Sequence, residues 1–425
     1  MNEKETNQII SLIKREVVPA IGCTEPVAVA LCVAKATEVL GCLPDKIELY
    51  LSGNIIKNAM GVGIPGTGMI GLPIAVALGA IVGKSEYQLE VLNDVNPEAL
   101  EKGKQYIADG RIKILHKADA PSNLHIEAYV EAAGHKACAV ISGAHTNFVY
   151  IEKDGKVLFE KTQETAADNT DDDIRLTEHM VYDFAMQTPL EKIEFILEAA
   201  EMNRKAALMA LENDYGHGLG STIRKHGKFI FGDTPISHIL SVTSAACDAR
   251  MGGAQVAVMS NSGSGNQGIT AILPVACYAT EINASREDLV RALILSSLTS
   301  IYIKQSLGRL SALCGCVVAS TGASAGLVHL MGGGFNELCS AIKNMVANLA
   351  GMICDGAKPA CAMKISSGVS TALLSAMLAM NGTCVSSAEG IVCDDIDGTI
   401  RNLTSIGREA MTETDRHVLN IMVNK

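Results

Sequence analysis

Two long stretches of this 425-residue chain contain no Asp, Glu, Lys or Arg, and they limit the folds that are open to it. Residues 251–280 and 310–336 are rich in Gly, Ser, Thr and Asn and poor in Leu, Ile and Phe. A membrane-spanning helix needs about 20 mostly apolar residues with aromatic anchors at its ends, and the chain has no Trp. Both stretches therefore predict helices buried on all sides of a helical core, and a membrane transporter is the disfavoured alternative.

Charge and cysteine usage narrow the partners and the compartment. The formal net charge is −11, so neither nucleic acid nor an anionic membrane surface is expected as a partner. The 13 cysteines, many of them in apolar or Ala-rich segments, predict free thiols in a reducing compartment. The first ten residues, MNEKETNQII, have no signal-peptide core, which predicts a cytoplasmic protein. The high apolar content favours a homodimer.

Helix and strand patterns divide the chain into regions and predict an α+β fold class. Residues 1–42 contain two helical patterns, and residues 43–165 predict an α+β domain with a mostly antiparallel sheet. The acidic segment Ala166–Asp173 is expected to be a linker. Residues 174–425 are almost wholly helical and predict an all-α catalytic domain. The expected strands are 46–51, 112–116, 124–132, 136–142, 147–152 and 156–160.

Three cysteines in the helical region are the strongest sign of chemistry. Cys314 lies forty positions before Cys354, and Cys361 follows seven positions later. Thiolates suit zinc or an iron–sulfur cluster. A zinc site would want a fourth Cys or His at regular spacing, and no CxxC or HxxxH motif supplies one. Three cysteines without a fourth therefore predict a cluster with one open iron, which is a Lewis acid.

Two further residues are candidates for proton transfer. Cys23 directly precedes a predicted helix start, where the helix dipole favours a thiolate with a lowered pKa. Its alternative is a small buried hydrophobic side chain. His145 lies at a strand connection, where a lone His is more often structural than catalytic.

Two segments carry amide, hydroxyl and cationic side chains that suit an anionic ligand. Residues 261–268 (NSGSGNQG) precede a helix, and their backbone N–H groups could bind a carboxylate or a phosphate. An ordinary loop is the alternative. Residues 54–58 place amides and a cation after a strand. The candidate substrate contacts are Asn54, Lys57, Ser262, Ser264 and Asn266.

Two other motifs favour structural interpretations. Residues 61–66 match G-x-G-x-x-G by letter, but eight residues separate them from the preceding strand, and Pro65 removes a donor. A turn or a loop that closes over a ligand is therefore favoured over a dinucleotide site. Residues 393–398 resemble part of a calcium loop but lack its final Glu, so Asp394 or Asp395 is expected to cap a helix.

Taken together, these segments resemble the L-cysteine desulfidases, which are related to the iron–sulfur L-serine dehydratase alpha chain. The resemblance runs over essentially the full length. It implies that Cys314, Cys354 and Cys361 hold a [4Fe-4S] cluster and that Cys23 is the catalytic cysteine. Cys316 competes with Cys314 as the first ligand, and the spacing alone prefers Cys314. The matching segments are Gly22-Cys23-Thr24-Glu25-Pro26, Ser52-Gly53-Asn54, Ser262-Gly263-Ser264-Gly265-Asn266 and the three late cysteines.

The resemblance also implies a reaction, the β-elimination of L-cysteine to pyruvate, ammonia and sulfide. The amino acid would bind the open iron through its carboxylate, and the metal would act as a Lewis acid and template. Cys23, or His145 as second choice, would remove the α-proton. The chain lacks the Ser-His-Thr-x-Gly-Pro segment and the C-terminal Cys of the classical serine dehydratases, so L-serine dehydratase stays an alternative. A pyridoxal-phosphate lyase and a non-catalytic binding protein are the others.

Overall fold

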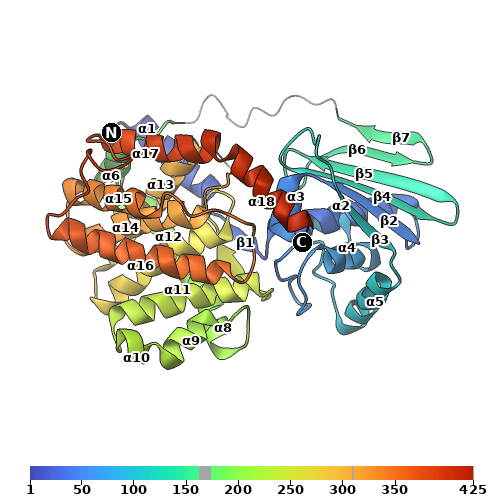
Figure 1. The fold of residues 1–425 in the computed structure, drawn as a ribbon, viewed down its shortest axis with the longest axis horizontal. Helices are drawn as coiled ribbons and strands as arrows, with labels where there is room; N and C mark the ends of the chain where they lie inside the picture. Colours follow the sequence, from blue (N-terminus) through green and yellow to red (C-terminus); the bar gives the residue numbers. More distant parts are fainter. Residues whose placement is uncertain (162–173, 309–310, 425) are drawn as a thin grey trace.

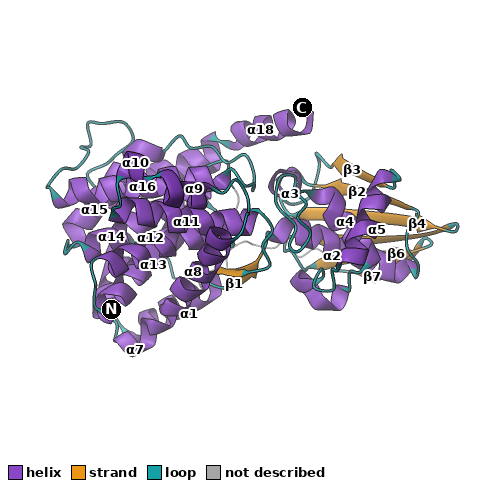
Figure 2. Cartoon of the chain, turned by 90° about the horizontal axis from the view of Figure 1, so that it is seen from below, coloured by secondary structure: helices purple, strands orange, loops and turns teal. Residues whose placement is uncertain are grey.

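The computed structural model describes residues 1–161, 174–308 and 311–424, which form a sheet-containing domain and a helical domain side by side (Figure 1). The predicted α+β fold class, with a mixed sheet in the N-terminal half and a mostly helical C-terminal region, is confirmed. The two domains remain distinct when the molecule is turned by 90° (Figure 2). The linker expected at Ala166–Asp173 lies outside the described residues.

The sheet-containing domain is built on a six-stranded sheet with the order β3-β2-β4-β5-β6-β7. Within it, β2 and β3 pair in parallel and the other neighbours pair antiparallel. Each expected strand is present to within a residue at either end. The strands are β2 (Lys46–Leu51), β3 (Ile112–His116), β4 (His125–Ala132), β5 (His135–Ser142), β6 (Phe148–Lys153) and β7 (Lys156–Glu160).

Apolar and polar residues alternate along the strands, so one face of this sheet is buried in a core. In β2, Ile47, Leu49 and Leu51 are fully buried, whereas Glu48 and Tyr50 point to the opposite face, as the two-residue period of a strand requires. Three helices pack into the core on the buried face: α2 (Thr24–Leu40), α4 (Leu72–Ile81) and α5 (Pro97–Ala108). A 3₁₀ turn, η1 (Ser85–Glu90), joins α4 to α5.

The helical domain packs around one large apolar core. Its outer helices and a 3₁₀ turn are α6 (Glu178–Gln187), α7 (Leu190–Ile193), η2 (Glu194–Ile196), α8 (Leu197–Glu212), α9 (Leu219–His226) and α10 (Lys228–Phe231). The next helices are α11 (Pro235–Met251), α12 (Gly265–Glu281), α13 (Arg286–Leu307), α14 (Gly315–Leu330), α15 (Phe335–Leu349) and α16 (Cys361–Met380). The C-terminal elements are α17 (Ile396–Ser405), the π-helical segment η3 (Ile406–Ala410) and α18 (Thr412–Asn424).

Helix α14 lies in the middle of this domain and contacts α12, α13, α15 and α16. Small residues allow this packing: a Cβ atom added at Gly322 would lie 2.2 Å from the Oγ of Ser300 on α13. Nearly all of α14 is buried, which confirms the buried helix predicted within residues 310–336. By length and composition, α16 is the one helix in the described residues that could cross a membrane, and half of its most apolar window is buried.

The chain passes between the two cores near its N-terminus. Helix α1 (Glu3–Glu16) contributes to the helical core, whereas α2 contributes to the sheet-containing core. Between them, β1 (Pro19–Ile21) pairs antiparallel with β8 (Ala257–Met259) of the helical domain. This pairing was not expected from the sequence. It fixes the segment that leads into Cys23 at the junction of the two domains.

A second contact between the domains involves the segment after α3 (Gly53–Ala59). Gly63 donates its backbone N–H to the carbonyl of Met251 at 2.9 Å. A Cβ atom at Gly63 would lie 2.4 Å from the carbonyl carbon of Gly252, so only glycine permits this approach. The G-x-G-x-x-G letters at 61–66 therefore describe a turn that docks on the end of α11, which agrees with the structural interpretation.

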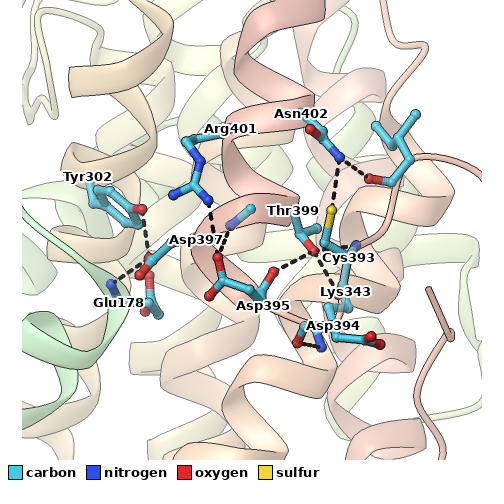
Figure 3. Close-up of polar contacts among 12 residues, drawn as sticks. Glu178, Tyr302, Lys343, Cys393, Asp394, Asp395, Asp397, Thr399, Arg401 and Asn402 are labelled. Carbon is cyan, nitrogen blue, oxygen red and sulfur yellow. Dashed lines mark hydrogen bonds and ion pairs between the residues drawn. The ribbon is translucent and has the colours of Figure 1, made fainter.

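The start of α17 is tied to three other helices by polar contacts (Figure 3). Asp395 caps α17 as expected, accepting from the N–H of Gly398 at 2.7 Å. Asp397 accepts from the hydroxyl of Tyr302 at 2.6 Å, and Lys343 donates to the carbonyl of Asp394 at 2.6 Å. From this anchor, α18 extends out of the helical domain and reaches α3 of the other domain (Figure 1).

Candidate active site

Cys23 lies at the junction of the two domains, immediately before α2. It is the N-cap residue of that helix, and its side chain is buried. Burial raises the pKa of the Cys23 thiol to about 12, although the guanidinium of Arg250 acts in the opposite direction through its charge and a hydrogen bond. The lowered pKa expected from the helix start is therefore not found, because desolvation outweighs the favourable charges.

Cys314 and Cys354 are brought together by a short antiparallel bridge between the residues that precede them. The N–H of Cys314 donates to Met352 at 2.9 Å, and the N–H of Cys354 donates to Ala312 at 2.7 Å. A hydrogen bond between the two thiols raises the pKa of Cys314 and lowers the pKa of Cys354. The two shifts have opposite directions, and the one that favours ionisation falls on Cys354.

Lysine side chains surround the loop that joins Cys354 to Cys361. Lys358 contacts the carboxylate of Asp355 at 2.5 Å, and Lys364 pairs with the same carboxylate. Burial opposes ionisation of Asp355, but the hydrogen bonds from the two lysines outweigh it and lower its pKa to about 2. The positive charge of Lys364 also lowers the pKa of Cys354, so the loop is built to hold a thiolate.

Cys361 is the first residue of α16 and interacts electrostatically with Cys354 and Cys23. Burial raises the pKa of its thiol, and the charge of Cys354 adds to that effect. Cys361 in turn acts on the pKa of Cys23. The predicted ligands and the predicted catalytic cysteine therefore belong to one electrostatic cluster, although they come from three separate parts of the chain.

The three predicted cluster ligands all supply the same kind of donor. Among the residues that the structure describes, no three Cys, His, Asp or Glu side chains converge closely enough to hold one ion. A cluster binds each thiolate on a different iron and so accepts ligands that are further apart. Cys314, Cys354 and Cys361 supply soft donors, and the charges of Lys57 and Lys364 beside Cys354 offset the negative charge of bound thiolates.

Cys316 faces a different partner from Cys314. Its thiol donates to the carbonyl of Lys364 at 3.0 Å, and a Cβ atom at Gly368 would lie 2.6 Å from its sulfur. Burial raises the pKa of Cys316 to about 12. This thiol packs between α14 and α16, whereas Cys314 is already paired with Cys354, and the contrast favours Cys314 as the first ligand.

Lys57 is brought to the cysteine loop, but its charge is already paired. The side chain is only 3 % exposed and forms an ion pair with Asp415 of α18. Its carbonyl oxygen would lie 2.0 Å from a Cβ atom added at Gly356, so the 354–361 loop packs directly on α3. Asn54 lies one helical turn earlier on α3.

The predicted substrate loop at 262–266 mainly stabilises itself. The hydroxyl of Ser262 donates to Asn261 at 2.8 Å, and the hydroxyl of Ser264 caps α12 by accepting from the N–H of Gln267 at 3.4 Å. Asn266 differs, because its side-chain oxygen accepts from Arg250 at 3.0 Å. Asn266 therefore joins the cluster around Cys23, and the two serines have structural partners.

His145 lies in the turn between β5 and β6. The register of the sheet pairs Ser142, at the end of β5, with His125. The backbone carbonyl of His125 accepts from the N–H of Ser52 at 2.9 Å. Because α3 begins directly after Ser52, His145 lies at the end of the sheet from which α3 starts. The cysteines come instead from the starts of α2, α14 and α16 and from the loop before α16, so His145 belongs to a different structural element.

Two residues that the sequence analysis missed are buried beside these cysteines. Arg250, at the end of α11, is 7 % exposed, and Gln267, in the first turn of α12, is 4 % exposed. The Nε of Arg250 and the Oε1 of Gln267 are buried without a hydrogen-bond partner. A signal for Arg250 was present, because it is the last charged residue before the charge-free stretch 251–280.

Comparison with known proteins places this arrangement in a family. A family model of the serine dehydratase alpha chain matches residues 86–420. The chain belongs to this family. Relatives that match over essentially the whole of both chains are UPF0597 proteins of Bacteroides fragilis at 61 % identity, Porphyromonas gingivalis at 54 % and Chromobacterium violaceum at 44 %.

Membership of the serine dehydratase alpha chain family confirms the relation that the sequence motifs indicated. The matched range contains Cys314, Cys354 and Cys361 as well as Arg250 and Gln267. Cys23 and Lys57 precede that range, but the UPF0597 relatives match them as part of the full chain.

Proposed function

We propose that this chain is a lyase that removes the β-substituent of a small amino acid, with L-cysteine as its main substrate. The products would be pyruvate, ammonia and sulfide. One observation carries the proposal: Cys23, the Cys314–Cys354 pair and Cys361 belong to one electrostatic cluster at the domain junction. Cys23 and Cys314 are buried in it, and Cys354 and Cys361 are half-buried. Family membership supports a lyase of this type.

Cys314, Cys354 and Cys361 would hold a [4Fe-4S] cluster. When bound, its open iron would supply a Lewis acid that withdraws electrons from the substrate. The protein contributes the charge balance around it, because Lys57 and Lys364 lie close enough to Cys354 to favour its thiolate. Buried thiolates without such cations would be strongly disfavoured.

Cys23 is the first choice for the base that removes the α-proton. Its thiol is buried, so its thiolate would be a strong base once formed, and the charge of Arg250 favours that thiolate. The electrons of the Cα–H bond would form a Cα–Cβ double bond as the Cβ–S bond breaks and sulfide leaves. Hydrolysis of the resulting aminoacrylate gives pyruvate and ammonia. His145 is the second choice for this base.

The alternatives differ in leaving group or in cofactor. L-Serine dehydration would use the same residues with hydroxide leaving in place of sulfide. A pyridoxal-phosphate lyase would need a Lys that can form a Schiff base as a neutral amine. Lys57 is the one buried Lys among the described residues, and its amine is engaged in an ion pair with Asp415, which disfavours this alternative.

The test is an anaerobic assay of pyruvate and sulfide with L-cysteine and L-serine. We expect pyruvate from both, faster from L-cysteine, and loss of activity when a chelator removes iron. Iron and acid-labile sulfide should be present in comparable amounts. An iron-free preparation that keeps full activity, or activity that depends on added pyridoxal phosphate, would contradict the proposal.

A further inference from the structure

The geometry points to a receptor for the α-carboxylate and the α-ammonium group of an amino acid, formed by Arg250 and Gln267. This inference deepens the proposed function and rests on it for the identity of the ligand as an amino acid. It does not depend on a bound cluster, because both side chains are placed by α11 and α12. Arg250 would bind the carboxylate, and Gln267 would accept from the ammonium group.

Arg250 is a buried cation without a carboxylate partner among the described residues, although a hydrogen bond joins it to the thiol of Cys23. Its Nη1 donates to the neutral side chain of Asn266 at 3.0 Å and lies 3.9 Å from the sulfur of Met251. Its Nε has no partner, and within the described residues no carboxylate forms an ion pair with it. A guanidinium is always charged, and a buried charge without a partner is strongly unfavourable. An anionic group of a ligand would remove that cost.

Gln267 supplies the complementary acceptor. Its Oε1 is fully shielded and has no hydrogen-bond donor. The side chain packs on the start of α14, since a Cβ atom at Gly315 would lie 3.0 Å from both the Cγ and the Cδ of Gln267. Gly315 directly follows Cys314. The side-chain amide of Gln267 is therefore held next to a predicted cluster ligand.

The first turn of α12 contacts Arg250 and contains Gln267, so it positions both unsatisfied side chains. Asn266, which bonds Arg250, is the neighbour of Gln267 in the first turn of α12. A Cβ atom at Gly265 would lie 2.3 Å from the Nε of Arg250, so this turn packs directly against the guanidinium. The arrangement offers one charged donor and one neutral acceptor at the same turn.

This pairing of donor and acceptor selects the class of ligand. A phosphate or a simple carboxylate would satisfy Arg250 but would leave the oxygen of Gln267 without a donor. An amino acid satisfies both, because its carboxylate accepts and its ammonium group donates. Lys57, the predicted cation for this role, already has Asp415 as its partner, so Arg250 is the cation left for a ligand.

Three small ligands separate the two roles by calorimetric binding to the anaerobically purified, cluster-loaded protein. L-Alanine carries both groups and cannot undergo β-elimination, propionate carries the carboxylate alone, and ethylamine carries the amine alone. We expect Arg250→Gln to weaken L-alanine and propionate binding about tenfold or more and to leave ethylamine unchanged. Gln267→Met should weaken L-alanine and ethylamine binding and leave propionate unchanged.

Matched controls and thermal melting keep this test independent of misfolding. Arg291 and Gln305 are also partly buried, but they donate to backbone carbonyls in the helical domain. We therefore expect Arg291→Gln and Gln305→Met to leave all three affinities unchanged. Arg250→Gln should melt at or above the wild-type temperature without ligand, because it removes an unpaired buried charge. A lower melting temperature with equal loss for all three ligands would indicate a structural role and overturn the inference.

The outcome also separates this inference from the proposed function. If the wild-type chain forms pyruvate but Arg250→Gln binds L-alanine as tightly as the wild type does, the receptor is wrong and the lyase proposal stands. If the wild-type chain forms no pyruvate from any amino acid but Arg250→Gln selectively loses propionate, the carboxylate receptor stands and the lyase proposal fails.

Discussion

Two buried polar clusters of the helical domain differ in how completely their groups are satisfied. At the anchor of α17, Asp397 accepts from Tyr302 and from the N–H of Glu178 (Figure 3). The carboxyl group of Glu178 accepts from the hydroxyl of Thr299. At the cysteine cluster, Arg250 and Gln267 keep buried atoms without partners. Native proteins satisfy nearly all buried polar groups, so the first cluster is suited to hold structure and the second to receive a ligand.

One atom of the α17 anchor is also unsatisfied, and its chemistry explains why. The Oε2 of Glu178 has no partner, and burial raises the pKa of Glu178 to about 8. A protonated carboxyl is neutral, so the cost of the missing partner is small compared with that of a buried ion. Arg250 cannot become neutral in this way, because a guanidinium does not lose its proton. The contrast supports the proposal that the cysteine cluster is the functional one.

The largest effect that would test this contrast is expected at Cys354. Cys354→Ser should remove bound iron and acid-labile sulfide and abolish pyruvate formation. The substitution removes a predicted cluster ligand, the thiol whose pKa its surroundings lower. Cys384→Ser is the matched control, since Cys384 is an exposed cysteine and should keep both iron and activity. A Cys354→Ser protein with full iron content would remove the basis for calling this cluster the active site.

A second comparison decides between the two neighbouring cysteines on α14. We expect Cys314→Ser to lose most of its iron, because Cys314 is hydrogen-bonded to Cys354. Cys316→Ser should keep its iron, because a hydroxyl can still donate to the carbonyl of Lys364. Iron analysis of the two purified variants distinguishes them. The reverse result would make Cys316 the ligand.

The bridge between the domains should matter for stability. Asp415→Asn leaves the buried charge of Lys57 without its partner and should lower the free energy of unfolding by about 3 kcal/mol. Adding Lys57→Met to that variant should restore much of the loss, because no unpaired charge then remains. Urea unfolding of the two single variants and the double variant measures this coupling. Additive losses would show that the ion pair is not the source of the effect.

The α17 anchor should make stability depend on pH in one direction. The pKa of Glu178 in the folded state, about 8, is above its value in the unfolded chain, so the folded state binds the extra proton. Its contribution to stability is therefore fully present below the unfolded pKa and is lost as pH rises through about 8, with a slope of at most about 1.4 kcal/mol per pH unit. Glu178→Gln should flatten this dependence in urea unfolding. Equal pH profiles for the two proteins would exclude this role for Glu178.

The smallest effect is expected at the helix cap. Asp395→Ala should lower the free energy of unfolding by about 1 kcal/mol, because it removes the side-chain acceptor for the N–H of Gly398. Asp394→Ala is a matched control, since Asp394 contributes its backbone carbonyl to Lys343 and its side chain should matter by less than about 0.5 kcal/mol. Equal losses in the two variants would contradict the assignment of the cap.

Much of the fold could be predicted because its signals are local. The six strands of the main sheet follow from apolar alternation and turn residues, and the buried helix α14 follows from the absence of charge between 310 and 336. The pairing of β1 with β8 could not be predicted, because three-residue strands carry little pattern and the pairing joins distant parts of the chain. The nearly continuous helical pattern of residues 174–425 did not predict the π-helical segment between α17 and α18.

The residues of the candidate site also fall into those that could be predicted from the sequence and those that could not. The cysteines could be selected from their residue type and spacing, which are visible in the sequence. The pKa of Cys23 could not be predicted, because burial at the domain junction outweighs the helix start. Arg250 and Gln267 were missed because their significance lies in partners that they lack, and only the packed structure shows that. Lys57 was predicted as a substrate contact, and its ion pair with Asp415 could not be predicted because the two residues lie 358 positions apart.

The most direct test of the central claim is the alkylation of individual cysteines, followed by mass spectrometry, in cluster-loaded and chelator-treated protein. We predict that Cys314, Cys354 and Cys361 are protected together in the loaded protein and become reactive together after chelation. The exposed Cys42 and Cys384 should react in both states. Unchanged reactivity of the three cysteines on removal of iron would show that they do not hold a cluster.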